Sequence, residues 1–472
     1  MRGDDAHYEG RLGGAWLRPT AKAHPGHSRA HNRALVLSSL FHAGPLSRAE
    51  LARSTGLTRV TISDLVAELA GEGFIEDRGA RAEARVGKPG NLIDINSDGQ
   101  IIAVIDLSDI KCARGALITL RGKVLVRASR ATAGATGEAM VEHTAALMAE
   151  LIERLDGGVG DGAALLGIGV AAPGVVRPDG LITYAKDYQW RDLPLSEILR
   201  DRLRAGAVGV HHGPGARDGS GGDAGVRNAK RDGIDRGAGA GVGTEDGIGG
   251  IGVGNGTEDG IGGVGVGNGT EGGIGGGTRN GAAHGIAEAS KAVFVANDAN
   301  LRALAEFTFA GASARGLMEV SLTDGLGAGI LLDGRLLLGP SNAAGEIGHI
   351  PAMAGGDPCA CGRRGCLETV LNRAVLGGQD GVLDAAILAR IGESTAAVLA
   401  PIVSAFNLSD LVFADPKGLF TPTVLNAIRA GMEERLLPEI MADLDIRVSE
   451  LGADAALLGA GALVLAERLG LT

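Results

Sequence analysis

The sequence lacks the features that would place a protein in a membrane or outside the cell. Its start, MRGDDAHYEGRLGG, carries acids and glycines where a signal peptide needs an apolar core. Its longest apolar stretch, residues 163–176, is too short and too interrupted by glycine to span a bilayer. Four cysteines among 472 residues cannot form a disulfide framework. With 45% apolar residues to build a core, we expect a soluble cytoplasmic protein.

Charge is distributed unevenly along the chain. Residues 1–95 hold 13 Lys and Arg against 11 Asp and Glu, a net charge of +2, whereas the rest of the chain has a net charge of −13. This distribution fits a small polyanion-binding module attached to an acidic domain that binds other ligands. Because an excess of two charges also arises by chance, the assignment of a polyanion-binding module depends on sequence motifs.

The N-terminal part of the chain has the pattern of a helix-turn-helix. Ser47 followed by Glu50 predicts a capping box at the start of a helix over 48–54, and Gly56 supplies the left-handed turn after it. Thr58 then caps a second helix. Its inward stripe consists of Ile62, Leu65, Val66 and Leu69.

Two strands follow the second helix and complete a winged helix. FIEDRG and NLIDIN predict these strands, and the loop between them contains Arg85 and Lys88. We therefore expect a winged helix-turn-helix over residues 28–96. It follows a leader, residues 1–27, that we expect to be disordered.

From residue 100 the pattern changes to α/β. IIAVIDLS, KCARGALITL and KVLVRAS predict three consecutive strands, followed by a helix near 137–155 and the buried strand LLGIGVAAPG. A second half runs from AVFVANDAN to ALLGAGALVLAERLG. Strands alternating with helices, with glycine-rich turns after the strands, predict an α/β sheet that holds ligands at its strand ends.

A glycine-rich segment, residues 206–288, separates the two halves. It contains a 13-residue repeat, GTEDGIGGIGVGN. A calcium-binding β-roll would need nonapeptide repeats with a recurring aspartate, which are absent at that spacing. Because the segment has almost no bulky side chains to bury, we interpret it as a flexible surface insertion without chemistry.

Three of the four cysteines lie in one short segment, GHIPAMAGGDPCACGRRGCLE. Cys359, Cys361 and Cys366 together with His349 offer three thiolates and one imidazole, the ligand set of a tetrahedral, closed, structural Zn²⁺ site. Such a site leaves no open position for catalysis. Reduced cysteines without a metal are the alternative.

A winged helix combined with VAAPGVV, VANDAN, GEIGH and CACGRRGCLE resembles the ROK family (repressors, open reading frames, kinases). The resemblance implies an actin-like (ribonuclease H-like) two-lobed sensor domain over 100–472 and places the chain among the family's repressors of sugar metabolism. It also implies zinc at the cysteine cluster and a sugar or sugar phosphate as effector. In the family, the hexose is held by the positions of Asn297, Asp298, Glu346, His349 and Glu368. The alternative for Glu346 and Glu368 is that they are solvated loop acids.

The phosphate-binding turns depart from the family pattern. A kinase of the family would use Asp298 as the base on a sugar hydroxyl and glycine-rich turns to hold ATP. Where the family has DxGxTK, residues 106–111 read DLSDIK, and Asp324 replaces a threonine that would face the phosphates. We therefore expect a sugar sensor without kinase activity that does not use ATP. The alternative is an active, glucokinase-like, ATP-dependent sugar kinase carrying a DNA-binding domain.

One further family feature remains in the chain. GAGA at 459–462 reads as a glycine-rich turn of the kind that contacts nucleotides. Such turns are common, so this one does not outweigh the departures at 106–111 and Asp324.

The second helix of a winged helix enters the major groove of DNA. The candidate contacts are Arg48, Thr58, Arg59, Thr61, Ser63, Arg85 and Lys88. Arg59 is the candidate for a guanine, because its guanidinium matches O6 and N7; the alternative is a solvated surface residue. Since one winged helix makes few contacts, we expect a homodimer or homotetramer on a palindromic operator. A scaffold whose winged helix binds protein in place of DNA is a further alternative.

Overall fold

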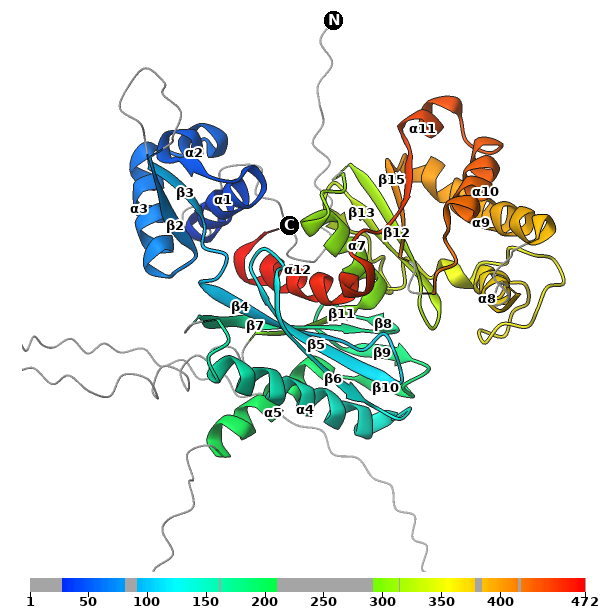
Figure 1. Cartoon of the computed structure of the whole chain (residues 1–472), viewed down its shortest axis with the longest axis horizontal. Helices are drawn as coiled ribbons and strands as arrows, with labels where there is room; N and C mark the ends of the chain where they lie inside the picture. Colours follow the sequence, from blue (N-terminus) through cyan, green and yellow to red (C-terminus); the bar gives the residue numbers. More distant parts are fainter. Residues whose placement is uncertain are drawn as a thin grey trace, which may run out of the picture. The chain divides into compact units, whose positions relative to one another are not determined.

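The computed structural model describes most of the chain (Figure 1). The described residues are 28–80, 91–160, 163–209, 292–313, 315–377, 384–414 and 417–471. The predicted leader and residues 210–288 of the predicted insertion therefore lie outside them. Residues 206–209, which we assigned to the insertion, belong to helix α5 (Leu195–Gly209).

The N-terminal residues fold as the predicted winged helix. Its elements are α1 (Ser28–Ala43), β1 (Leu46–Ser47), α2 (Arg48–Thr55), α3 (Arg59–Gly71), β2 (Ile75–Ala80) and β3 (Asn91–Ile95), with an antiparallel sheet in the order β1-β3-β2. The capping box of Ser47 and Glu50 is present, and Gly56 has a φ of 69°. The predicted stripe of α3 is buried. The local signals in the sequence were therefore sufficient to define this fold.

The first lobe is built on a five-stranded sheet in the order β11-β7-β4-β5-β6. Its strands are β4 (Gln100–Asp106), β5 (Cys112–Thr119), β6 (Val124–Ala131), β7 (Ala164–Ala172) and β11 (Val293–Asn297). Helices α4 (Gly137–Asp156) and α5 cover one face and α12 (Ala455–Leu469) covers the other (Figure 1). A small sheet in the order β10-β9-β8 extends this lobe: β8 (Val175–Val176), β9 (Ile182–Ala185) and β10 (Trp190–Leu193).

The second lobe has its own five-stranded sheet, in the order β14-β13-β12-β15-β16. These strands are β12 (Gly316–Leu322), β13 (Leu326–Leu332), β14 (Arg335–Leu336), β15 (Asp410–Ala414) and β16 (Asp445–Val448). Helix α7 (Asp298–Phe309) packs on β12 and β13, and α8 (Leu367–Gly377), α9 (Ala385–Phe406), α10 (Pro422–Glu433) and α11 (Pro438–Asp443) complete the lobe (Figure 1). The short helices η1 (Ile347–His349) and η2 (Gly452–Asp454) lie in its loops.

Helix α9 is long and apolar enough in composition to cross a membrane. Half of its apolar window is nevertheless buried inside the fold, and the helix packs extensively on α10. A core helix accounts for both its length and its composition.

Helices α7 and α12 pack against each other and join the two lobes. The approach is close because of glycine: a Cβ on Gly459 would lie 1.9 Å from the backbone oxygen of Leu301. Our interpretation of residues 459–462 as a turn is therefore wrong, since they lie inside α12. Their glycines permit helix packing, and the predicted actin-like, two-lobed architecture depends on this contact.

Candidate ligand pocket and DNA-binding surface

The five residues predicted to hold a sugar line one cavity of 390 Å³. Asn297 and Asp298 come from the start of α7, Glu346 and His349 from η1 and the residue before it, and Glu368 from α8. Positions up to 71 residues apart in sequence thus converge on one cavity. Asn297 and Asp298 are placed there because β11, the last strand of the first lobe, leads directly into α7. The volume suits a small-molecule ligand.

The start of α7 is fixed before any ligand binds. Asn297 accepts a hydrogen bond from the backbone N–H of Asn300 (3.0 Å) and donates one from its amide to the carbonyl of Gly174 (2.9 Å). It therefore caps the helix and anchors the Pro-Gly turn that follows β7. Asp298 is next in sequence, only 9% exposed, and burial raises the pKa of its carboxyl group.

A buried set of charged groups lies beneath Asp298. The guanidinium of Arg302, one helical turn along α7 and 2% exposed, opposes the rise in the Asp298 pKa and donates to the Ser108 hydroxyl at 3.1 Å. Burial also raises the pKa of Glu319, in β12, to about 8, and Arg302 opposes this rise too. Arg302 therefore joins α7 to the loop after β4. Sequence reasoning missed it, although its spacing of four from Asp298 was a usable signal.

The two glutamates have different surroundings. Glu368 accepts a hydrogen bond from the backbone N–H of Leu326 at 3.0 Å, which ties α8 to the start of β13. Partial desolvation raises the pKa of Glu346, and the nearby His349 opposes that rise. Both glutamates line the cavity that a ligand would occupy.

The cysteine cluster has the geometry of a metal site. The ligand atoms of His349, Cys359, Cys361 and Cys366 all lie within 4.8 Å of one another. Sγ of Cys359 is 3.5 Å from Nδ1 of His349, and the Sγ atoms of Cys361 and Cys366 are 3.6 Å apart. A tetrahedron with Zn–S bonds of about 2.3 Å has S···S edges of about 3.8 Å, so the donor set fits this ion.

The loop around the cluster is held by its backbone. Cys359 donates from its N–H to the carbonyl of Arg363 at 2.8 Å. Gly365 has a φ of 69°, and a Cβ there would lie 1.8 Å from the carbonyl oxygen of Met353. Burial and the neighbouring cysteines raise the pKa of Cys366, and a bound cation would favour its thiolate form. The residues present are thus compatible with a metal.

A carboxylate lines the part of the cavity where the family pattern would place a phosphate. Asp324, in the hairpin between β12 and β13, accepts a hydrogen bond from the backbone N–H of Ile110 at 3.4 Å. Ile110 lies in the β4–β5 loop, where the family pattern would place a phosphate. An acid therefore occupies the amide group that a phosphate oxygen would need.

The exposed start of α3 carries the predicted DNA-contacting residues. Thr58 caps the helix through the N–H of Thr61 (3.2 Å), and the Ser63 hydroxyl donates to the carbonyl of Arg59 at 2.9 Å. Arg59 is exposed, as is Arg48 at the start of α2. Arg85 and Lys88 lie outside the described residues. Sequence reasoning missed Val60, which is 71% exposed between Arg59 and Thr61.

Comparison with protein-family models gives one match, the ROK family model, over residues 286–377. That segment includes all five pocket residues and the complete cysteine cluster. The chain contains a ROK-family domain.

The relatives of this chain include both regulators and kinases. A xylose repressor of Bacillus spizizenii is 21% identical over 92% of this chain and 94% of its own length. A glucokinase of Halalkalibacterium halodurans is 30% identical over 36% of this chain and 63% of its own length.

The fold has a close counterpart among solved structures. A ROK family transcriptional regulator described as a homolog of the E. coli MLC protein superposes with a TM-score of 0.64, at 19% identity. The superposition covers 94% of this chain and 98% of the solved chain. The match extends over the winged helix as well as the ROK domain, and it supports the fold.

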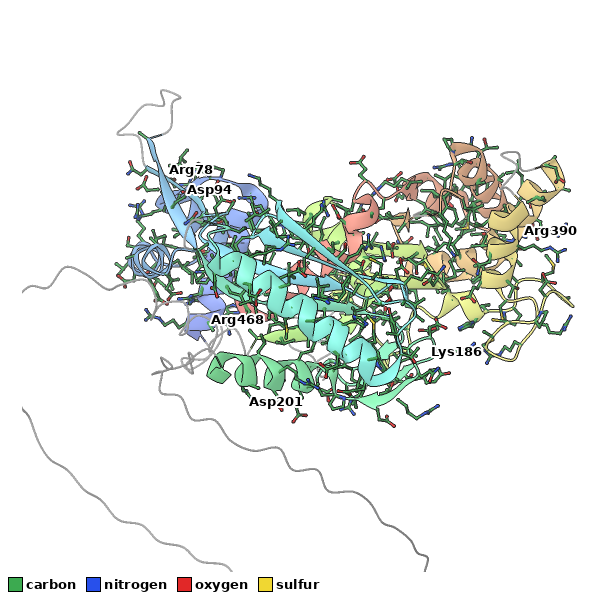
Figure 2. The ribbon with its side chains drawn as sticks, turned by 60° about the horizontal axis from the view of Figure 1, so that its bottom comes forward. Arg78, Asp94, Lys186, Asp201, Arg390 and Arg468 are labelled. Carbon is green, nitrogen blue, oxygen red and sulfur yellow. The ribbon has the colours of Figure 1, made fainter. Side chains whose placement is uncertain are left out.

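The ROK domain contacts the winged helix directly. Arg121, in the β5–β6 turn, donates to the carbonyl of Phe41 at 3.2 Å and pairs with Asp94 at 2.9 Å. Asp94 lies in β3 next to Arg78 of β2, 3.8 Å away (Figure 2). The rings of Phe41 and Phe309 have centroids 6.4 Å apart. Phe309 ends the helix that begins at Asp298, so one helix of about 18 Å connects the pocket to the winged helix.

Proposed function

We propose that this protein is a sugar-responsive, DNA-binding transcriptional repressor of carbohydrate metabolism that acts in the cytoplasm. The observation that carries the proposal is a complete winged helix joined to a ROK pocket whose phosphate side is blocked by Asp324. Similarity to a named repressor over 92% of the chain supports it. In this proposal residues 28–96 bind DNA and residues 100–472 sense the ligand.

Asn297, Asp298, Glu346, His349 and Glu368 hold the sugar. Carboxyl groups suit this task because each offers two oxygens to a ring of hydroxyl groups, and a buried pair left without its hydroxyl is costly. The helix start that presents Asp298 is already fixed by Asn297. The pocket is therefore preorganised for a neutral, hydroxyl-rich ligand.

Zn²⁺ at His349, Cys359, Cys361 and Cys366 supports the pocket without taking part in chemistry. Nδ1 is the His349 nitrogen that faces the sulfur atoms, so Nε2 is left for the ligand. A metal that fixes one ring nitrogen orients the other.

The DNA contacts come from the exposed start of α3. Arg59 reads a guanine, and Val60 offers the apolar contact that a thymine methyl group accepts. Arg48, Thr58, Thr61 and Ser63 contact phosphates and neighbouring bases, and Arg85 and Lys88 of the wing contact the backbone or the minor groove. A homodimer or homotetramer places two winged helices on the two half-sites of a palindromic operator.

Ligand binding reaches the DNA-binding domain through α7. A sugar that engages Asp298 acts on one end of this helix, and Phe309 at the other end packs on Phe41 of α1. The effect on DNA requires that the sugar has different affinities for the DNA-bound and free arrangements.

A DNA-binding assay tests the proposal. An operator is selected from random duplex DNA with the zinc-loaded protein, and its affinity is measured by fluorescence anisotropy. We expect Arg59→Ala to weaken specific binding roughly ten- to hundredfold. Arg390→Ala, at an exposed arginine of α9 (Figure 2), serves as the control and should change nothing. If the protein binds no DNA, or binds with no salt dependence, the repressor proposal is wrong and a protein-binding scaffold is favoured.

The second candidate function is a sugar kinase. Retention of Asp298 and the similarity to a glucokinase favour it. Asp324 and Ile110 oppose it, because the phosphates of ATP would meet a fixed negative charge. Phosphorylation of any hexose by ATP at ordinary enzymatic rates would establish this function instead.

A further inference from the structure

A second hollow opens from the ligand pocket toward the cysteine cluster. This groove measures 800 Å³. It shares six residues with the pocket: Val175, Tyr184, Lys186, Glu346, His349 and Ala360. The two spaces are therefore continuous, and Glu346 and His349 stand at the passage between them.

The two spaces differ in chemistry. The pocket alone is lined by the acids Asp298, Asp324 and Glu368. The groove alone is lined by Ile350 and Arg363, among others, and Lys186 is a cation common to both spaces. A ligand that passes from pocket to groove thus moves from an acidic, hydrogen-bonding wall to one that combines apolar and cationic groups.

Tyr184 forms an aromatic wall of the groove. It lies in β9, paired with Val175 of β8 and Arg191 of β10, and its side chain is 44% exposed. The guanidinium carbon of Arg191 is 5.1 Å from the centre of the ring, which fixes the ring's orientation. An exposed aromatic ring held on a sheet can pack against the C–H face of a sugar ring.

The groove also has an aliphatic surface and hydrogen-bond donors. Ile350 directly follows His349 and is 39% exposed. Lys186 lies at the rim of the first lobe (Figure 2), and Arg363 comes from the cysteine-rich loop of the second lobe. Both side chains are exposed and can donate to ligand hydroxyl groups.

We propose that this groove is a second saccharide subsite and that the effector is a disaccharide or longer saccharide, whose terminal ring enters the pocket. The inference rests on the proposed sugar-binding function and names its ligand class. A single ring would leave the groove empty. A phosphate group would use the two cations but neither Tyr184 nor Ile350, and the groove is far larger than a phosphate.

Calorimetric titration of the full-length, zinc-loaded protein tests the inference. The probes are common hexoses and pentoses, the disaccharides built from them, and hexose 6-phosphates. We expect at least one disaccharide to bind about tenfold or more tightly than the monosaccharide of its terminal ring. Because Tyr184 also borders the pocket, Tyr184→Ala should abolish that gain by lowering disaccharide affinity far more than monosaccharide affinity, whereas Tyr184→Phe should keep the gain.

Two controls separate the groove from the pocket and from the surface. Asp298→Ala should weaken monosaccharides and disaccharides alike, because it removes a group of the pocket itself. Phe406→Ala removes an aromatic side chain of similar exposure, 41%, that lines neither space, and it should change nothing.

Each outcome decides one claim. If monosaccharides bind but no disaccharide binds more tightly, or if a hexose phosphate is the tightest ligand, the subsite inference is wrong and the sugar-sensor function stands. A disaccharide gain that survives Tyr184→Ala also overturns the subsite. If no saccharide of any kind binds, both the proposed sensor function and the subsite fail.

Discussion

The two sides of the cleft differ although they belong to one pocket. On one side, α7, η1 and α8 bring Asn297, Asp298 and Glu368 together with their neighbours around an open space. On the other side, Asp324 already accepts the hydrogen bond of the Ile110 amide. A neutral polyol needs carboxyl acceptors, whereas a triphosphate needs amide donors and cations. Under the proposed function, the fold retains saccharide recognition and has lost nucleotide recognition.

The largest expected effect concerns the support of the sugar side. Removal of zinc, or Cys366→Ala, should release the cysteine-rich loop and with it His349, because three of the four ligands lie in that loop. We expect saccharide binding to be lost and the Tm to fall by about 5 °C or more. Metal content, titration calorimetry and thermal unfolding measure these effects.

Cys112→Ser is the matched control for the zinc prediction. Cys112 lies in β5, outside the cluster. The Cys112→Ser variant should therefore keep full zinc content and full saccharide affinity. Equal saccharide affinity with and without metal would contradict the supporting role of zinc.

A smaller loss of saccharide affinity is expected when the buried acid of the pocket, Asp298, is changed. Asp298→Ala should weaken saccharide binding about 100-fold, since it removes a buried carboxyl group that holds ligand hydroxyls, a loss of about 3 kcal/mol. Asp201→Ala, at an exposed aspartate of α5 (Figure 2), should have no effect. Unchanged affinity in Asp298→Ala would place the ligand elsewhere.

The acid beneath the cleft predicts a pH dependence of stability. Burial raises the pKa of Glu319 from 4.5 to about 8. The unfolded chain therefore loses this proton first as the pH rises, so the stability that Glu319 contributes is complete below 4.5 and is lost as the pH rises through 8. Glu319→Gln should become progressively more stable relative to wild type over this range.

Urea unfolding at several pH values measures this difference. The control Glu393→Gln changes an exposed glutamate of α9 that pairs with Arg435 at the surface. It should show no such trend. A Glu319→Gln difference that is flat with pH would mean that the buried carboxyl group does not hold its proton in the folded state.

The smallest effect is expected on the phosphate side. Asp324→Asn removes a negative charge but leaves Ile110 and the altered loop in place, so we expect ATP analogue affinity to rise only about three- to tenfold. No phosphoryl transfer should appear. Asp443→Asn, at an exposed acid of α11, is the control and should leave nucleotide affinity unchanged. Kinase activity in Asp324→Asn would mean that this single acid blocks an otherwise intact site.

Local signals in the sequence predicted the structure well. The cap at Thr58 and the capping box at Ser47 depend on residues three positions apart, and the cysteine cluster depends on a compact motif. Each of these interactions joins residues that are close in sequence, so it can be predicted from the sequence.

Long-range contacts could not be predicted in the same way. The contact of Asp324 with Ile110 joins residues 214 positions apart, and no local pattern identifies the partner. Residues 459–462 were misread because glycines that permit close helix packing look the same in sequence as glycines of a turn. Val60 was overlooked because its exposure depends on how α3 packs.

The most direct test of the account compares both ligands on one preparation. The zinc-loaded protein is titrated with its saccharide and with a non-hydrolysable ATP analogue, and the same sample is assayed for phosphoryl transfer. The account predicts saccharide binding that is about 100-fold weaker in Asp298→Ala, only weak nucleotide binding and no transfer. Tight nucleotide binding beside Asp324, or turnover at ordinary enzymatic rates, would contradict it.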